Sequence, residues 1–232
     1  MKTALVTGIN KGLGKELFSQ LIARGYFVYG LLRNEAYYEQ LQGQQLPNAT
    51  LILADIASDE CKEKIRLVVK DKPIDLLINN AGIGGEGMSL DKADTTEIMD
   101  LLQVHCLGAL RVVQALKDNL LEASSPVVLN LSSRLGSLSR QYDGTFSNLQ
   151  SSYAYRIAKA AQNMLTMCLR AELGSRIEFV SITPGKLLTQ LAQKDANLSP
   201  AEGAERIIRF WEEGRFKAQN GILQVPDNLT AW

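Results

Sequence analysis

Short apolar runs alternate with stretches of helical periodicity along the whole chain. Each apolar run is continuous instead of alternating with polar residues, which is typical of strands buried on both faces of a parallel sheet. The predicted strands lie at residues 4–6, 27–32, 50–53, 74–78, 127–131, 177–182 and 222–225. The predicted helices are one that ends near residue 24 and five at residues 34–42, 58–71, 95–121, 152–173 and 200–213.

The alternation of strands and helices predicts an α/β fold. We expect a doubly wound, seven-stranded and mostly parallel sheet with helices on both faces. A chain of 232 residues, of which 46% are hydrophobic, can bury a full core. Because no linker, repeat or low-complexity run interrupts the pattern, we expect one domain over residues 1–232.

Charge and cysteine usage argue against several classes of partner. Lys and Arg number 25, as do Asp and Glu, so no basic excess favours nucleic acid or an anionic membrane. Cys61, Cys106 and Cys168 form no CxxC pair, which is typical of reduced thiols and gives no support for a metal site. The sequence shows neither an apolar leader nor an apolar run of membrane-spanning length. We therefore expect a cytoplasmic protein without a metal ion, a nucleic-acid partner or a membrane partner.

A glycine-rich turn joins the first predicted strand to the first predicted helix. It reads Thr7-Gly8-Ile9-Asn10-Lys11-Gly12-Leu13-Gly14. A helix that begins directly after a strand offers N–H groups and the positive end of its dipole to an anion, and glycines allow the anion to approach closely. The stretch therefore indicates a nucleotide diphosphate site, although alone it is equally typical of an ordinary glycine-rich turn.

Small and polar residues follow three later strands, where ligands bind in sheets of this kind. They are Asn79-Asn80-Ala81-Gly82, Ser132-Ser133 and Pro184-Gly185. The first motif lets the backbone pass close to a ligand, or simply ends its strand in a turn. A serine hydroxyl at such a strand end can donate to a substrate carbonyl oxygen as negative charge grows there, whereas most loop serines mark only a turn.

The predicted helix at residues 152–173 carries Tyr155 and Lys159. Residues four apart lie on one face of a helix, so the phenol and the ammonium can share a site. A nearby cation favours the phenolate, and we expect it to lower the pKa of the tyrosine toward neutral pH. Tyr153 is the competing tyrosine, but Ile157 stands four residues beyond it and cannot replace the lysine. The alternative is an exposed aromatic–lysine pair on a helix surface.

Taken in order, these motifs make the chain resemble the short-chain dehydrogenase/reductase family along essentially its full length. Residues 10–14, residues 155–159 and a carboxyl end at Trp232 look like its small carbonyl-reductase and C-factor-like branch. The resemblance implies a Rossmann fold and a nicotinamide dinucleotide cofactor. It also implies a reaction in which hydride is transferred to or from a carbonyl carbon.

The resemblance also implies roles for individual residues. Ser133, the second serine of its pair, orients the substrate, Tyr155 is the catalytic acid/base and Lys159 holds the nicotinamide ribose. The implied cofactor contacts are Gly8, Asn10, Lys11, Gly12, Leu13 and Gly14 in the pyrophosphate turn, Asp55 and Ile56 beside the adenine, Asn80, Ala81 and Gly82 beside the cofactor, and Pro184, Gly185 and Thr189 at the nicotinamide carboxamide.

Charge predicts which form of the cofactor binds. An acidic residue about 20 positions beyond the glycines accepts a hydrogen bond from a free ribose hydroxyl, whereas an arginine there suits a 2′-phosphate. The second predicted strand ends in Arg33, and Lys11 in the turn can reach the same phosphate. The sequence therefore predicts NADP, unless both are merely solvated surface charges.

Two features depart from the family pattern. The family usually places an asparagine in the long helix at residues 95–121, where it holds a water of the proton relay; this chain has His105 there, its only histidine. A neutral imidazole can hold a water too, so His105 is either a catalytic relay residue or a packing residue. Ser133 and Tyr155 are also 22 residues apart (155 − 133), longer than in most of the family. The extra loop either forms a wall of the active site or covers a dimerisation flank.

The sequence thus predicts an NADPH-dependent reductase of a ketone or aldehyde, with a small-molecule carbonyl compound as substrate. The alternative is a C-factor-like signalling or regulatory protein that binds the cofactor with little turnover. A homodimer through the helices at residues 95–121 and 152–173 is a further expectation, because many relatives dimerise there.

Overall fold

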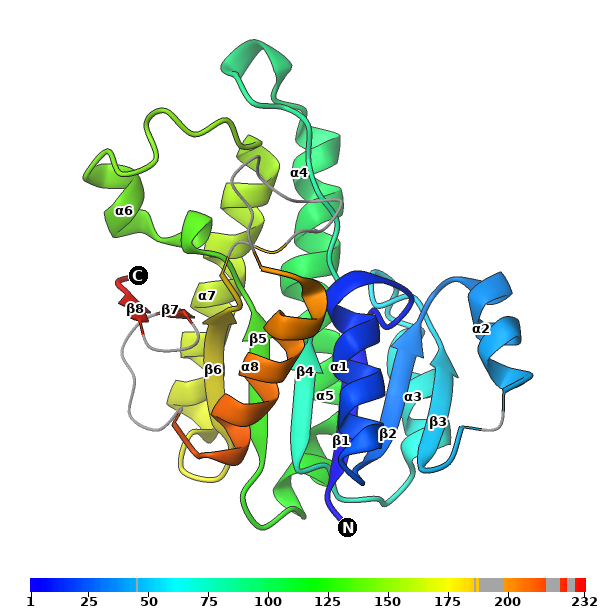
Figure 1. The fold of residues 1–232 in the computed structure, drawn as a ribbon. Helices are drawn as coiled ribbons and strands as arrows, with labels where there is room; N and C mark the ends of the chain where they lie inside the picture. The colour runs from blue at the N-terminus through cyan, green and yellow to red at the C-terminus, as the bar shows by residue number, and fades with distance from the viewer. Residues whose placement is uncertain (45, 186, 188–197, 216–221, 225–227) are drawn as a thin grey trace.

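A computed structural model of the chain describes residues 1–44, 46–185, 187, 198–215, 222–224 and 228–232 (Figure 1). The strands are β1 Thr3–Thr7, β2 Phe27–Leu32, β3 Ala49–Leu53, β4 Leu76–Asn79, β5 Val127–Leu131, β6 Glu178–Thr183, β7 Ile222–Gln224 and β8 Asn228–Thr230. The helices are α1 Gly12–Ala23, α2 Glu35–Gln42, α3 Cys61–Val69, α4 Thr95–Leu102, α5 Gly108–Leu121, α6 Leu138–Tyr142, α7 Tyr153–Leu173 and α8 Pro200–Glu212, with 3-10 segments η1 Leu90–Lys92 and η3 Arg134–Gly136 and π-helical segment η2 Gln103–Leu107.

The strands form one sheet in the order β3-β2-β1-β4-β5-β6-β7-β8, parallel except for the pairing of β7 with β8. The chain proceeds from β1 outward to β3 and then crosses back, so that β4 pairs with the other side of β1. The carboxyl ends of β1 and β4 are therefore neighbours although their connections run in opposite directions. Such a switch point leaves a crevice for a ligand in doubly wound sheets.

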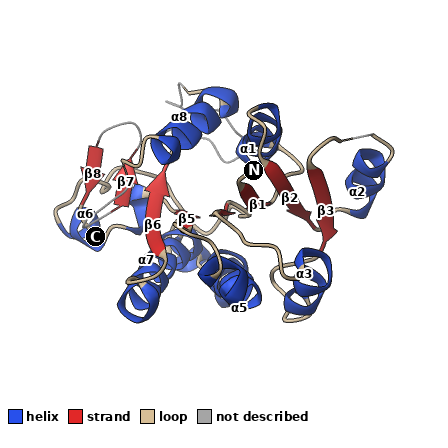
Figure 2. Ribbon diagram, turned by 90° about the horizontal axis from the view of Figure 1, so that it is seen from below, coloured by secondary structure: helices blue, strands red, loops and turns tan. Residues whose placement is uncertain are grey.

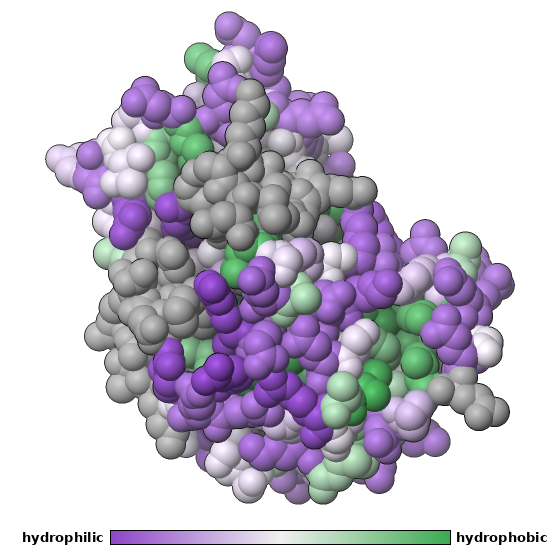
Figure 3. All heavy atoms as spheres, viewed as in Figure 1, coloured by the Kyte–Doolittle hydropathy of each residue, from purple (hydrophilic) through white to green (hydrophobic). Residues whose placement is uncertain are grey.

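Helices cover both faces of the sheet. Figure 2 shows α1 and α8 on one face and α3, α5 and α7 on the other. Successive residues of β1 serve the two layers in turn: Ala4 and Val6 pack under α1 and α8, whereas Leu5 packs toward α3 and α5. This double burial explains why the strands read as continuous apolar runs. The outer face over α1 and α8 is mostly hydrophilic (Figure 3).

The predicted α/β fold is confirmed, but the predicted count of seven strands was wrong. Six parallel strands of four to six residues, β1–β6, form the body of the sheet. Two three-residue strands, β7 and β8, extend its edge, so the described residues form eight strands. The sequence of β8, Asn-Leu-Thr, contains no apolar run and so lacks the pattern that predicts a buried parallel strand. β8 is instead a short antiparallel strand at the edge of the sheet.

The predicted single helix at residues 95–121 was also only partly right. A π-helical segment, η2, separates α4 from α5 and places His105 at the break. By length and mean hydropathy (1.2) the stretch Thr95–Leu121 is apolar enough to cross a membrane, but half of its most apolar window is buried within the protein. Gly108 lets α5 approach the loop after β3, because a Cβ atom there would lie 2.8 Å from Ile56 Cδ1.

Candidate active site

The glycine turn is fixed to the neighbouring strand end by one hydroxyl group and one amide. Thr7 Oγ1 accepts hydrogen bonds from the N–H groups of Asn80 and Ala81, both at 3.0 Å. The Asn80 side chain in turn donates to the carbonyl oxygens of Thr7 (2.9 Å) and Gly8 (3.3 Å). The Asn-Asn-Ala-Gly motif therefore braces the turn, and Thr7 has a structural role.

Two glycines are required by this close contact. A Cβ atom on Gly8 would lie 2.8 Å from Ala81 Cα, and Gly8 also has φ +75°. A Cβ atom on Gly14 would lie 2.2 Å from the Gly8 carbonyl oxygen and 2.4 Å from Asn80 Nδ2. No side chain larger than hydrogen fits at Gly14 without moving backbone atoms. The glycine spacing is therefore set by packing between β1, α1 and the loop after β4.

The amino end of α1 fits an anion. Lys11 is its N-cap residue, with extended backbone and no capping hydrogen bond from its side chain, and the first turn, which includes Leu13, holds no acidic residue. The first N–H groups of a helix have no partner inside the helix. Asn10 and Gly12 are partly exposed beside this end, so the backbone donors are accessible to a phosphate.

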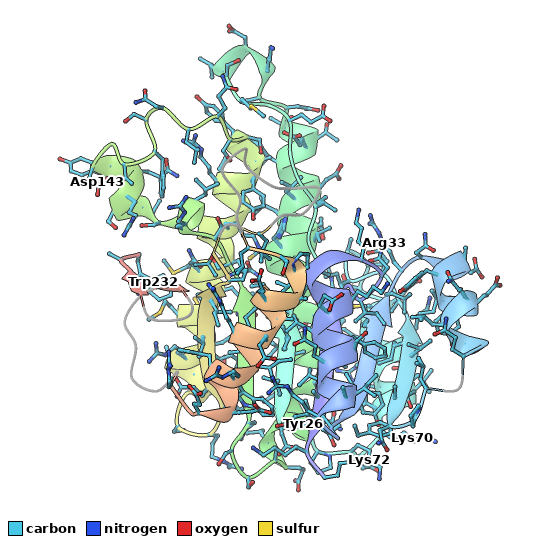
Figure 4. The ribbon with its side chains drawn as sticks, viewed as in Figure 1. Tyr26, Arg33, Lys70, Lys72, Asp143 and Trp232 are labelled. Atoms are coloured by element: carbon cyan, nitrogen blue, oxygen red, sulfur yellow. The ribbon has the colours of Figure 1, made fainter. Side chains whose placement is uncertain are left out.

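The residues predicted to select the cofactor lie at the same carboxyl end of the parallel strands. Arg33 follows β2 and its Nη1 lies 3.7 Å from Asp55 Oδ2, with both side chains about half exposed (59% and 45%). Figure 4 shows Arg33 at the end of the sheet opposite Tyr26. An exposed pair at this distance contributes little free energy and leaves the guanidinium available to a phosphate. Ile56 is buried and packs against Gly108, so its side chain serves the core.

The segment after β6 is described only in part. Pro184 is buried, and Gly185 has φ +92°, a conformation that favours glycine. Thr189, predicted to contact the nicotinamide carboxamide, lies outside the described residues. Its role stays a prediction.

The structure brings Ser133 and Tyr155 together and separates their two competitors from the site. Ser133 caps η3, its Oγ accepting from Leu135 N–H, and its hydroxyl lies near enough to Tyr155 to influence the pKa of that phenol. Ser132 instead is buried and donates to Asn163 Oδ1. Tyr153 is 42% exposed at the start of α7. The choice of Ser133 and Tyr155 as the catalytic serine and tyrosine stays a prediction.

Lys159 lies buried one helical turn beyond Tyr155. Its Nζ donates to the carbonyl oxygen of Leu131 and to Gln162 Oε1 (3.0 Å), and it lies 5.8 Å from the centre of the Tyr155 ring. Only 4% of the residue is exposed. This burial lowers the pKa of Lys159 to about 7, so its charge is easily lost in the absence of a ligand.

The expected lowering of the tyrosine pKa is absent from the ligand-free chain. Burial raises the pKa of Tyr155 above its ordinary value, and the nearby Ser133 hydroxyl opposes this only in part. The main cause is that burial of Tyr155 disfavours the charged phenolate.

His105 lies beside Tyr155 and under the loop that follows β4. The two rings meet edge to face with centres 5.6 Å apart. His105 Nε2 lies 2.8 Å from the Ile83 carbonyl oxygen, to which it donates in one tautomer, and 3.3 Å from the Ile83 N–H, from which it accepts in the other. A Cβ atom on Gly82 would lie 2.6 Å from the imidazole. Nδ1 is buried without a hydrogen-bond partner. Burial first, and the charge of Lys159 second, lower the pKa of His105 to about 3, so the ring is neutral.

Comparison with known proteins gives the family. The profile of the short chain dehydrogenase family matches residues 2–198, which include the glycine turn, the serine pair and the Tyr-x-x-x-Lys motif. The chain belongs to the short-chain dehydrogenase family. C-signal of Myxococcus xanthus is 32% identical to it over 162 residues, which are 66% of this chain and 93% of that protein.

Two solved structures share the short-chain dehydrogenase fold over the whole chain. The carbonyl reductase Sniffer of D. melanogaster has a TM-score of 0.84 and 25% sequence identity, with 100% of both chains covered. An NADPH-bound carbonyl reductase from chicken fatty liver has a TM-score of 0.85 and 22% identity, with 100% of this chain and 99% of that chain covered. The resemblance inferred from the motifs is thereby confirmed.

The long segment between Ser133 and Tyr155 is built differently from the predicted loop. It contains η3 and the short helix α6, and Gln141 on α6 links the segment after Ser133 to α7. Gln141 Nε2 donates to the Leu135 carbonyl oxygen (2.8 Å), and its Oε1 accepts from Arg156 Nη1 (3.0 Å). Sequence reasoning missed Gln141, Arg156 and Gln162, because their contacts depend on tertiary packing and no spacing announces them.

The carboxyl end of this short-chain dehydrogenase rests on the same segment. Ser139 N–H donates to the Trp232 carbonyl oxygen (2.9 Å), and the buried Ser137 hydroxyl donates to the Ala231 carbonyl oxygen (2.6 Å). Figure 4 shows Trp232 beside the helix that leads to Asp143. The segment is thus anchored both to α7 and to the chain terminus.

The predicted dimer face carries an exposed apolar stripe. Tyr153, Ile157 and Met164 on α7 are 42%, 41% and 63% exposed. Their spacing of four and seven residues places them on one side of the helix. The homodimer itself stays a prediction.

Replacing Lys159 with Met should remove a pH-dependent contribution of this residue to the free energy of unfolding. The pKa of Lys159 is about 7 in the folded chain and near 10.5 in the unfolded chain, so folding releases protons between these values. The unfavourable burial of the ammonium is fully present below about pH 7 and absent above about pH 10.5. The melting temperature of Lys159→Met should therefore rise relative to that of the parent protein as pH falls through this window.

Circular dichroism melts without cofactor measure this difference. Lys64→Met, which changes an exposed lysine on α3, is the matched control and should differ from the parent by a constant amount. A constant difference for Lys159→Met as well would contradict burial of the charged group.

Proposed function

We propose that this chain is an NADPH-dependent reductase of a ketone or aldehyde. The observation that carries the proposal is that Ser133 and the buried Lys159 both lie beside Tyr155, at the carboxyl end of the sheet that also holds the glycine turn. The NADPH named in the description of the chicken carbonyl reductase supports the choice of cofactor. Arg33 at the end of β2 supports the phosphorylated form.

The catalytic residues have complementary tasks in this proposal. Bound NADPH supplies the hydride to the carbonyl carbon. The Ser133 hydroxyl donates a hydrogen bond to the carbonyl oxygen, and Tyr155 transfers its phenolic proton to that oxygen as charge develops there. The raised pKa of Tyr155 keeps the phenol protonated at neutral pH, which is the state that reduction requires.

Lys159 donates to two acceptors of the protein that ribose hydroxyls could replace. Its Nζ is held by the Leu131 carbonyl oxygen and by Gln162 in the ligand-free chain. Ribose hydroxyls are comparable acceptors, and we propose that Nζ turns to them when the cofactor binds. In this role the ammonium would hold the ribose and supply a positive charge beside Tyr155.

His105 completes the proposed proton path. We propose the tautomer in which Nε2 donates its proton to the Ile83 carbonyl oxygen, because Nδ1 then keeps a lone pair that can accept a hydrogen bond from a water molecule. A pKa of about 3 means that the ring does not itself titrate in the physiological range. We propose that it holds a water between Lys159 and the solvent, through which Tyr155 is reprotonated.

The regulatory alternative is kept open by the similarity to C-signal. A regulatory protein needs the cofactor site but has no need of a proton donor. The assembled Ser133, Tyr155 and Lys159 therefore favour turnover.

The first test is Tyr155→Phe. The parent protein should oxidise NADPH with one or more members of a panel of aldehydes, diketones and quinones, and the variant should lose at least about 100-fold in kcat because it lacks the proton donor. Tyr153→Phe, two residues away on the same helix, is the matched control and should keep the parent rate. Tight NADPH binding without turnover on the whole panel would support the regulatory alternative.

The second test concerns cofactor choice. Arg33→Asp should reverse the preference for NADPH over NADH in kcat/KM, because the carboxylate repels a 2′-phosphate and accepts from a free ribose hydroxyl. The change should appear in KM for the cofactor more than in kcat. An unchanged preference would show that Arg33 does not contact the phosphate.

The third test distinguishes a relay histidine from a packing histidine. His105→Ala should lower kcat by at least about tenfold, about 1.4 kcal/mol of barrier, if a water at Nδ1 takes part in proton transfer. His105→Asn keeps a polar side chain and should recover part of the rate. An unchanged kcat in His105→Ala, with a lower melting temperature, would assign the residue to packing.

A further inference from the structure

Arg134 stands next to the serine proposed to hold the substrate carbonyl. It is the first residue of η3, directly after Ser133, and its side chain is partly buried. The guanidinium lies over the ring of Phe146, 5.8 Å from its centre, and Phe146 is only 4% exposed. An aromatic face steadies a cation without neutralising it.

Other partly buried arginines in this chain are paired with oxygen atoms. Arg111 contacts the Asp59 carboxylate and the carbonyl oxygens of Ile56 and Gln103. Arg24 contacts the carboxylates of Glu205 and Glu212. In the described part of the chain, neither a hydrogen bond nor an ion pair joins the Arg134 guanidinium to an oxygen.

Arg140 places a second positive charge near Arg134. Burial, and then the neighbouring Arg140 charge, lower the pKa of Arg134. The carboxylate near Arg140 is Asp143, an exposed group whose pKa the Arg140 charge helps to lower, after the hydrogen bonds from Thr145. The segment after Ser133 therefore presents two guanidinium groups with little acidic compensation. A bound anion would supply it.

We propose that Arg134 binds a carboxylate on the carbonyl substrate, so that the preferred substrates are aldehydes or ketones that also carry an acid group. This inference rests on the proposed reductase function and specifies its substrate class. Arg140 strengthens the local positive potential, and Phe146 keeps the guanidinium in place.

The distance between the two groups limits which substrates fit. The Cα atoms of Ser133 and Arg134 are neighbours in the chain, about 3.8 Å apart. The Arg134 side chain therefore starts one residue from Ser133, and the proposal requires a substrate whose acid group lies several bonds from the carbonyl oxygen that meets Ser133 and Tyr155. A carboxylate on the far side of an aromatic ring, or at the end of a short chain, has this separation.

A matched pair of substrates tests the proposal. Compounds 4-carboxybenzaldehyde and methyl 4-formylbenzoate share the ring and the reacting aldehyde, but only the first is an anion. We expect the parent protein to prefer the acid in kcat/KM. Arg134→Met should lower kcat/KM for the acid by at least about tenfold, mostly through KM, and leave the value for the ester within about twofold.

Two further variants control for charge and for folding. Arg134→Lys keeps the charge and should retain part of the preference for the acid. Arg209→Met removes an exposed arginine on α8 and should retain the full preference. If Arg134→Met lowered kcat/KM equally for acid and ester, its role would be structural and the proposal overturned.

The outcome also separates this inference from the proposed function. Turnover of the ester with no preference for the acid, or a preference that survives Arg134→Met, would overturn the role of Arg134 and leave the reductase function intact. Absence of turnover with both aldehydes and with the wider carbonyl panel would overturn the function and this inference together.

Discussion

The junction between β1 and β4 is the contact on which the arrangement of the site depends. The Thr7 hydroxyl and the Asn80 side chain cross from one strand end to the other and satisfy backbone groups that no sheet ladder can pair. This brings the turn so close to the next loop that Gly8 and Gly14 have no room for a Cβ atom. The phosphate-binding geometry at the start of α1 is thus held by polar contacts behind it, and those contacts exist before any ligand binds.

A second constraint is the low polarity around the catalytic side chains. Burial raises the pKa of Tyr155 and lowers those of Lys159 and His105, so the ligand-free site carries little fixed charge. The charge that favours catalysis has to be established when substrate and cofactor arrive. Arg134 differs, because it lies on an aromatic face near solvent and keeps its charge at neutral pH.

Much of the fold was predictable because it depends on patterns within single segments. Strands buried on both faces need continuous apolar runs, and each of the seven predicted runs overlaps a strand of the sheet. The errors fall where tertiary contacts override local pattern. β8 pairs at an edge without an apolar run, η2 breaks a helix whose periodicity is unbroken, and α6 is too short to produce a periodic signal.

By itself, the sequence determined the fold class, the glycine turn and the Ser133, Tyr155 and Lys159 set, because each depends on residue type at a fixed spacing within one segment. Only the tertiary structure decided which partners these groups meet. It places the Gln162 side chain within hydrogen-bond distance of Lys159 and the Ile83 carbonyl oxygen within hydrogen-bond distance of His105. It also places the Phe146 ring against the Arg134 guanidinium. It also reversed the expected pKa of Tyr155 in the ligand-free chain. The physical reason is that burial and charge arise from segments that are distant in the sequence and meet only after folding.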